Sequence, residues 1–225
     1  MNKTKKVMVL LLAMLACVAA HAQSVDEPMR HWQGYIETSF QNTMNLGFEV
    51  GIKYYPIRYV GIGAGVGIGG DIGEPGTITF DAGDMKVIAD DGDGVVWFST
   101  GLQLQSPALW RSSDGDGGLS LKADLGIRLP APTNDKLVYR AIPNAAGTWE
   151  EDWQYECKHG GKSCILYFKP SVAYEAYRCQ IWLGYLWSNM DPYSGVRNVT
   201  IMGHHLDFPR KRPMHGLTIG FGYRF

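Results

Sequence analysis

Apolar and polar residues alternate regularly in the last segment of the chain, residues 215–225. Its apolar positions are Leu217, Ile219, Phe221, Tyr223 and Phe225. The residues between them are small or polar. A period of two places alternate side chains on opposite faces of a β-strand. The segment therefore predicts a strand with one apolar face and one small or polar face.

Seven earlier segments show the same alternation. They are Trp32–Phe40, Leu46–Tyr55, Tyr59–Gly69, Val95–Gln105, Leu119–Leu129, Leu166–Ala176 and Cys179–Ser188. Each has about the 9–11 residues that a tilted strand needs to cross a bilayer. The chain therefore predicts an all-β fold, an antiparallel up-and-down transmembrane β-barrel of eight strands. Ten strands remain an alternative.

The connections between these segments differ in length from one end of the strands to the other. The connections at one end are residues 41–45, 70–94, 130–165 and 189–214, and those at the other are 56–58, 106–118 and 175–178. Long loops at one end and short turns at the other are typical of membrane barrels. The 106–118 connection breaks this pattern because it is as long as a loop, and a short helix around Pro107–Arg111 would account for it.

The N-terminus has the pattern of a secretory signal peptide. Lys3, Lys5 and Lys6 precede an apolar run, Val7–Val18, and an A-x-A cleavage site at residues 20–22. This run is too short to span a bilayer as a helix, which needs about 20 residues. We therefore expect a signal peptide at residues 1–22 and a barrel domain at 23–225. A lipoprotein site at Cys17 is a weaker alternative.

Charged residues on the small or polar face help to decide which face points outward. Four acids and five bases occupy this face. This near balance suits ion pairs inside a closed barrel, because a buried charge needs a partner. The expected interior charge network comprises Glu37, Glu49, Lys53, Lys122, Asp124, Arg128, Lys169, Glu175 and Arg224.

Glycines and aromatic residues favour the same orientation. Alternate glycines from Gly61 to Gly69 would leave room inside a narrow barrel for Tyr35, Trp97, Tyr167 and Trp182. Aromatic residues near the strand ends would form girdles at two lipid–water interfaces. They are Tyr54, Tyr174, Tyr223 and Phe225 at one end, and Phe40, Phe48, Phe98, Phe168 and Trp187 at the other. The alternative is a secreted soluble ligand-binding barrel, which would bury the apolar face.

The ending Leu217–Phe225 resembles the C-terminal β-signal of bacterial outer-membrane proteins, which ends in phenylalanine. The mature chain resembles the small eight-stranded outer-membrane barrels of the OmpA-transmembrane-domain type. The resemblance implies a place in the outer membrane of a Gram-negative-type bacterium, in contact with its lipids and lipopolysaccharide. It also implies that the barrel-assembly machinery reads Leu217, Ile219, Phe221, Tyr223 and Phe225 as an assembly signal.

Three cysteines follow the predicted cleavage site, and an exported protein enters an oxidising compartment. Cys157 and Cys164 flank a flexible polar segment, so we expect a disulfide bond between them. Two free thiols are the alternative.

The sequence contains no clear catalytic motif. His204 and His205 are close in sequence to Ser188, Asp191 and Asp207, but adjacent residues on a strand point to opposite faces. No nucleophile elbow or metal signature accompanies them. We therefore expect no catalytic residues, cofactor or metal, with a lipid-modifying hydrolase or acyltransferase as the less favoured alternative.

Charge and length limit the remaining functions. The chain has 225 residues and a net charge of −1, which suits one domain and argues against a nucleic-acid partner. The basic cluster at residues 210–212 could pair with lipopolysaccharide phosphates, but a solvated surface is the favoured interpretation. We expect a closed barrel that presents long extracellular loops in a structural or surface-interaction role.

Overall fold

The structure is a computed structural model, and the description covers most of the chain after residue 29. The described residues are 30–42, 45–71, 78–82, 85–90, 95–113, 117–131, 135–141, 153–157, 164–190, 199–201, 203–205 and 214–225. The expected signal peptide, residues 1–22, lies outside them. Within these ranges, no helix is long and apolar enough to cross a membrane.

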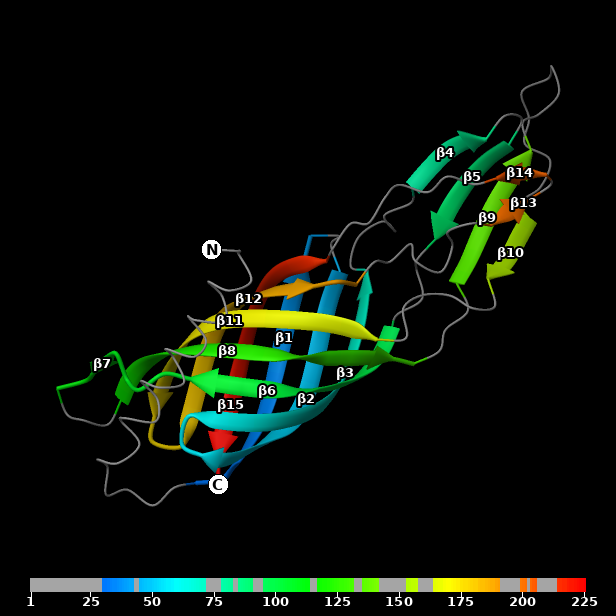
Figure 1. Ribbon diagram of the computed structural model, residues 1–225. Helices are drawn as coiled ribbons and strands as arrows, with labels where there is room; N and C mark the ends of the chain where they lie inside the picture. The colour runs from blue at the N-terminus through cyan, green and yellow to red at the C-terminus, as the bar shows by residue number, and fades with distance from the viewer. Residues whose placement is uncertain are drawn as a thin grey trace, which may run out of the picture.

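Eight antiparallel strands form a closed barrel (Figure 1). They are β1 (Trp32–Gln41), β2 (Asn45–Ile57), β3 (Val60–Asp71), β6 (Val95–Gln105), β8 (Gly117–Pro130), β11 (Ile165–Ala176), β12 (Cys179–Ser188) and β15 (His215–Arg224). Each strand pairs with the one before it and the one after it in this list, including β8 with β11. The first and the last, β1 and β15, pair with each other and close the ring. The predicted up-and-down barrel of eight strands is confirmed.

The strands are staggered as well as closed. A row of directly paired residues can be followed around the barrel from Leu119 of β8 back to Leu129 of the same strand, ten residues further along. The residues between them in this row are Tyr174, Ile181, Phe221, Ile36, Val50, Val66 and Phe98. With strands about 4.8 Å apart and a rise of about 3.3 Å per residue, this stagger tilts the strands by about 40°.

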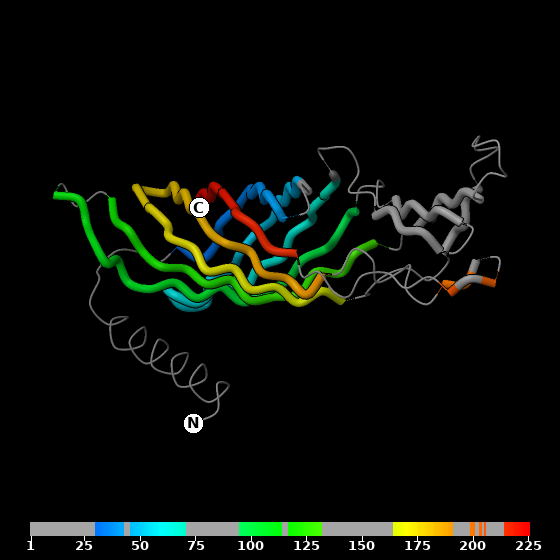
Figure 2. The backbone as a smooth tube through the Cα atoms, turned by 90° about the horizontal axis from the view of Figure 1, so that it is seen from above, coloured from blue at the N-terminus to red at the C-terminus, as the bar shows by residue number. Residues whose placement is uncertain are grey.

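The barrel has two distinct ends. At the loop end, strands β3, β8 and β12 finish and the long connections begin. At the turn end lie the connections from β2 to β3, from β6 to β8 and from β11 to β12, together with the C-terminus. Figure 2 shows the barrel turned by 90°, with the strands running between these ends.

The long connection at the turn end contains a strand. β7 (Trp110–Arg111) pairs with the start of β8, and the amide of Leu109 donates to the carbonyl of Leu119 at 2.7 Å. The expectation of a short helix is therefore wrong, because these backbone groups extend the β6–β8 ladder. Two extra residues, Pro107 and Ala108, form a bulge between the paired parts.

A second sheet lies beyond the loop end (Figure 1). It contains β4 (Ile78–Ala82), β5 (Met85–Asp90), β9 (Asp135–Ala141) and β10 (Trp153–Cys157), in the order β10-β9-β5-β4. A separate pair is formed by β13 (Thr200–Ile201) and β14 (His204–His205). The pairing of β5 with β9 joins two long connections in one sheet, which the sequence analysis did not anticipate.

Candidate functional site

The exposure of side chains in the barrel is the inverse of that in a water-soluble domain. On β15, outward Leu217 and Ile219 are 55% and 56% exposed, whereas inward Thr218 is 1% exposed. The interior holds all nine residues of the expected charge network. Seven are buried, namely Glu37, Glu49, Lys53, Lys122, Asp124, Arg128 and Lys169. Glu175 and Arg224 are half-buried near the turn end.

Glu49 of β2 accepts hydrogen bonds from four side chains. Arg128 Nη2 lies 3.1 Å from its Oε2, and the indole Nε1 of Trp97 donates to the same oxygen at 2.9 Å. The hydroxyls of Tyr35 and Ser99 donate to Oε1 at 2.8 and 3.0 Å. Because β3 and β6 separate β2 from β8, the Glu49–Arg128 ion pair crosses the interior and links opposite parts of the wall.

A second ion pair links β1 with β11. Lys169 Nζ donates to both carboxylate oxygens of Glu37, at 2.6 and 2.7 Å. The indole of Trp182 also donates to Glu37 Oε2 at 2.7 Å. Lys169 lies 3.4 Å from Asp124 as well, so one ammonium group is shared between two carboxylates.

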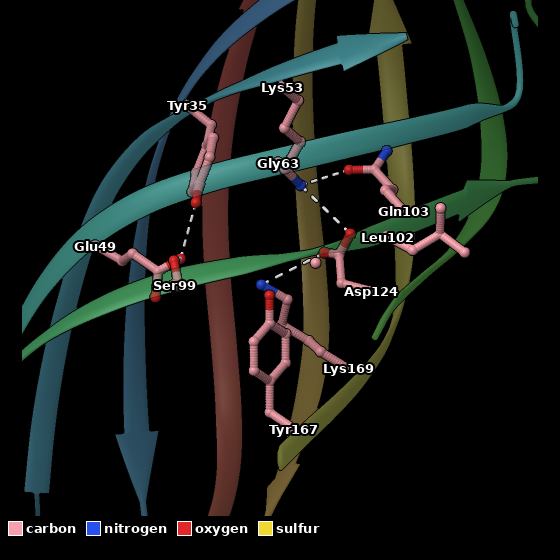
Figure 3. Close-up of a pocket in the computed structure, with 11 residues that line it drawn as sticks. Tyr35, Glu49, Lys53, Gly63, Ser99, Leu102, Gln103, Asp124, Tyr167 and Lys169 are labelled. Carbon is pink, nitrogen blue, oxygen red and sulfur yellow. Dashed lines mark hydrogen bonds and ion pairs between the residues drawn. The ribbon is translucent and has the colours of Figure 1, made fainter. Parts of the chain in front are cut away.

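Asp124 also pairs with Lys53: the Nζ of Lys53 lies 3.4 Å from the Oδ1 of Asp124 (Figure 3). Lys53 also donates to the side-chain oxygen of Gln103 and lies over the ring of Tyr35, 4.8 Å from its centroid. A cavity of about 10 Å³ remains among these side chains and Tyr167. It has room for one water molecule at most.

Lys122 is an exception among the interior charges. Within the described part of the chain, no carboxylate lies within ion-pair distance of it. Its ammonium group instead donates to Gln180 at 3.0 Å and lies 3.8 Å from the ring centroid of Trp182. An amide oxygen and an indole face therefore replace the carboxylate that the sequence analysis expected.

Side-chain amides near the turn end connect the network in a way that the sequence analysis missed. Gln33 and Gln103 both contact the hydroxyl of Tyr55, at 2.7 Å each. Gln180 Nε2 donates to Gln105 Oε1 at 3.3 Å. These residues lie on the same strand faces as the charges, so alternation alone was enough to place them inside.

The outermost pair of this network joins Glu175 of β11 to Arg224 of β15 at 2.9 Å. Gln105 contacts both partners, at 3.3 Å from Glu175 and 3.0 Å from Arg224. The side chains of Glu175 and Arg224 are 29% and 14% exposed, so this pair is more accessible to solvent than the pairs deeper in the barrel.

Apolar side chains cover the loop end of the interior. Ile165, Leu186 and Met214 are at most 4% exposed. A cavity of about 20 Å³ at this end is lined by Ile165 on one side and by Trp97 and Arg128 on the other. The cap was also missed, because an apolar residue such as Leu186 on the inward face interrupts the alternation.

Other candidate residues are only partly described. The structure does not show the expected disulfide bond, because Cys164 is an exposed free thiol and the side chain of Cys157 lies outside the described residues. The bond stays a prediction for the exported protein. Ser188 is buried and donates to the carbonyl of Met214 at 3.0 Å. His205 is exposed, and Asp191, Asp207 and residues 210–212 are not described. No group of metal-ligating side chains occurs among the described residues.

Four residues of the expected assembly signal project outward from β15, which lies between β12 and β1, and the fifth, Phe225, directly follows this strand. The exposed fractions are 55% for Leu217, 56% for Ile219, 40% for Phe221, 41% for Tyr223 and 58% for Phe225. They belong to the continuous apolar outer surface of the barrel.

Comparison of the sequence with protein-family models and with curated proteins gave no match. Several solved structures are similar in fold. The N-terminal β-barrel domain of Pseudomonas aeruginosa OprF has 8% identity and a TM-score of 0.44, covering 88% of this chain and 100% of that one. Neisserial surface protein A has 9% identity and a TM-score of 0.44, covering 87% and 96%. Ail of Yersinia pestis has 11% identity and a TM-score of 0.41, covering 88% and 100%.

At these identities the likeness concerns the fold alone. The closed strand order and register define the chain as a small eight-stranded, antiparallel up-and-down barrel. Chemically, the interior joins opposite parts of the wall through buried, charge-assisted hydrogen bonds.

Proposed function

We propose that the chain is an integral outer-membrane barrel of a Gram-negative-type bacterium. In this proposal its ion-paired interior is closed to ions, and its loop end serves as a surface platform in a structural or surface-interaction role. The observation that carries the proposal is the inverted exposure of the barrel wall. Its apolar residues point outward, whereas seven of the nine charges of the interior network are buried and the other two are half-buried.

The height of the apolar wall supports a membrane location. On β8 the row of outward-facing apolar residues begins at Leu119 and ends at Leu129. Ten residues at about 3.3 Å each, tilted by about 40°, rise about 25 Å along the barrel axis. Membrane barrels have an apolar band of about this height.

Aromatic side chains occur toward both limits of this band. At the turn end they are Trp32, Tyr54, Tyr174, Tyr223 and Phe225, and at the loop end Phe40, Phe48, Phe98, Phe168 and Trp187. All are more than a third exposed. Aromatic rings favour the lipid–water interface, so two girdles at this spacing suit a bilayer.

A soluble ligand-binding barrel is the alternative from another class. It would need a hydrated outer surface and an interior cavity for the ligand. The cavities described inside this barrel measure about 10 and 20 Å³, which is far below the size of an organic ligand. A lipid-modifying enzyme is the third candidate, and hydrolysis or acyl transfer on purified outer-membrane lipid would favour it.

Membrane fractionation tests the main proposal. The exported protein should sediment with outer membranes, resist extraction by salt and change its gel mobility on heating. Recovery as a folded, detergent-free soluble protein would contradict the proposal. Protease added to intact cells should cleave in the long connections of the loop end and leave the barrel strands intact.

A planar-bilayer recording tests the closed interior. We expect no steady conductance, because crossing ion pairs and the apolar cap at Ile165, Leu186 and Met214 occupy successive levels of the interior. A stable open channel of the native protein would contradict this part of the proposal while leaving the membrane location intact.

We also propose that the barrel-assembly machinery inserts the chain, and that Phe225 is the most specific residue of its assembly signal. Phe225→Ser should reduce the heat-modifiable folded form in membranes. Phe40→Ser is a matched control, because both rings are similarly exposed, at 58% and 54%. Equal losses in the two variants would show that the terminal position has no special role.

A further inference from the structure

The connection between β6 and β8 exposes two large apolar side chains at the turn end. Leu109 is 66% exposed and Trp110 is 53% exposed. They belong to the β7 hairpin, which comprises residues 106–113 and the start of β8. Figures 1 and 2 show that this hairpin stands beyond the neighbouring turn between β11 and β12.

The register determines which way Trp110 faces. Trp110 lies directly opposite Leu119, and directly paired residues of antiparallel strands project from the same face. Leu119 belongs to the outward apolar surface, being 37% exposed, as does Leu121 at 42%. Trp110 therefore continues the outward apolar surface of the barrel.

The hairpin also has a defined level along the barrel axis. The row of paired residues that contains Leu119 continues to Tyr174 in one direction and to Trp110 in the other. A strand spacing of about 4.8 Å at a tilt of about 40° places Trp110 about 3 Å nearer the turn end than Leu119. Tyr174 lies about 3 Å from Leu119 in the other direction, so Trp110 is about 6 Å beyond Tyr174, at the outer edge of the aromatic girdle at the turn end.

The bulge at Pro107 and Ala108 leaves this orientation unchanged, because a shift of two residues keeps each side chain on the same face of the strand. It shifts the register by two residues between the Gln105–Lys122 pair and the Trp110–Leu119 pair. The β7 hairpin therefore presents Trp110 beside the outward apolar wall.

We propose that the β7 hairpin is an interfacial anchor, with Trp110 inserted at the lipid–water boundary of the leaflet at the turn end. This inference rests on the proposed membrane location. Lipid is the favoured occupant because Trp110 continues the apolar wall that faces lipid in the proposed function. Indole is also suited to a boundary with apolar chains on one side and polar headgroups on the other. Arg111, the next residue, is exposed and can extend toward headgroup phosphates.

Fluorine NMR of fluorotryptophan-labelled protein in phosphatidylcholine nanodiscs tests the proposal. The Trp110 signal is assigned by its loss in Trp110→Phe. Two broadening agents are compared: a phosphatidylcholine with a nitroxide near the top of its acyl chain, and a water-soluble gadolinium chelate. We expect the nitroxide lipid to broaden Trp110 at least as strongly as Trp32, and the gadolinium chelate to leave it largely unaffected.

Other tryptophans separate this inference from the proposed function. Trp32 and Trp187 are exposed on the wall, at 44% and 50%, whereas Trp97 and Trp182 are buried inside and should be broadened less than these by either agent. Broadening of Trp110 by gadolinium alone, with Trp32 still broadened by lipid, would place the hairpin in water and overturn only the anchor. Protection of Trp110 from both agents would indicate protein contact and also overturn it. Failure of the lipid to broaden Trp32 and Trp187 would overturn the membrane location as well.

Discussion

Replacement of Glu49 by glutamine should strongly destabilise the barrel. The side chains of Glu49 and Arg128 are each 6% exposed and form an ion pair of 3.1 Å. Glutamine has nearly the same shape, so Glu49→Gln creates no cavity. It leaves the guanidinium of Arg128 buried without a carboxylate, and removal of one partner of a buried ion pair costs about 3–5 kcal/mol.

Glu175→Gln is a matched control, because it makes the same chemical change in the same interior. Glu175 pairs with Arg224 at 2.9 Å, but the two side chains are 29% and 14% exposed. Water can solvate the remaining charge there, so the expected loss is about 0–1 kcal/mol. The two variants should therefore differ in free energy of unfolding by about 2 kcal/mol or more.

Denaturant unfolding in phospholipid vesicles, followed by tryptophan fluorescence, measures this difference. Trp97 is a suitable reporter because its indole donates to Glu49 at 2.9 Å. The double variant Glu49→Gln/Arg128→Gln should recover part of the loss, since it removes the stranded charge. Equal losses for Glu49→Gln and Glu175→Gln, or native stability of Glu49→Gln, would refute the argument from burial.

Three further predictions concern the wall, the membrane and the thiols. Gly67→Ala should cost about 1–3 kcal/mol of unfolding free energy in the vesicle assay, because its Cβ would collide with an indole ring, whereas Gly34→Ala meets only one ring atom at 3.8 Å and should be tolerated. Ile219→Lys should cost about 2–4 kcal/mol in vesicles if it faces the bilayer core, and a neutral effect there would contradict a lipid-facing position. Cys157 and Cys164 should be joined in the exported protein, and two alkylatable thiols in a non-reduced digest would disprove the bond.

The barrel strands were predictable because each has one apolar and one small or polar face. The predicted segment Val95–Gln105 matches β6 residue for residue, and Cys179–Ser188 matches β12. Closure makes every strand obey the same rule, since no edge strand is left with a different environment. Alternation therefore assigned both the strands and the direction of their side chains.

The pairing of interior charges was not predictable from the same pattern. Contacts across the interior depend on the ten-residue stagger, which no single strand encodes. Lys122 is an example: the alternation along β8 correctly placed it inside, but its partner is Gln180 rather than a carboxylate. Glu49 likewise contacts Arg128 because the stagger of β8 places Arg128 at the same height along the barrel axis as Glu49.

The second sheet was missed for a different reason. β4 and β9 have five and seven residues, too few for the alternation expected of a membrane strand. Ile78–Phe80 and Met85–Ile88 nevertheless flank Gly83, and such short β-branched or aromatic runs around turn residues are a hairpin signal. The pairing of β5 with β9 joins distant parts of the chain and has no local signature.

Side chains block the interior of the barrel at more than one level along its axis. This determines whether loss of one ion pair lowers stability or opens a channel. Glycines of β3 receive large rings from other strands: an added Cβ at Gly67 would overlap Trp97, and one at Gly65 would overlap the Tyr35 hydroxyl. Rings thus occupy the space along a wall that has no side chains of its own, and the apolar cap is independent of the charges. Loss of the Glu49–Arg128 pair therefore leaves other obstructions in place. We expect Glu49→Gln to lower stability well before it permits steady ion flow, and an open channel with native stability would show that this pair alone closes the barrel.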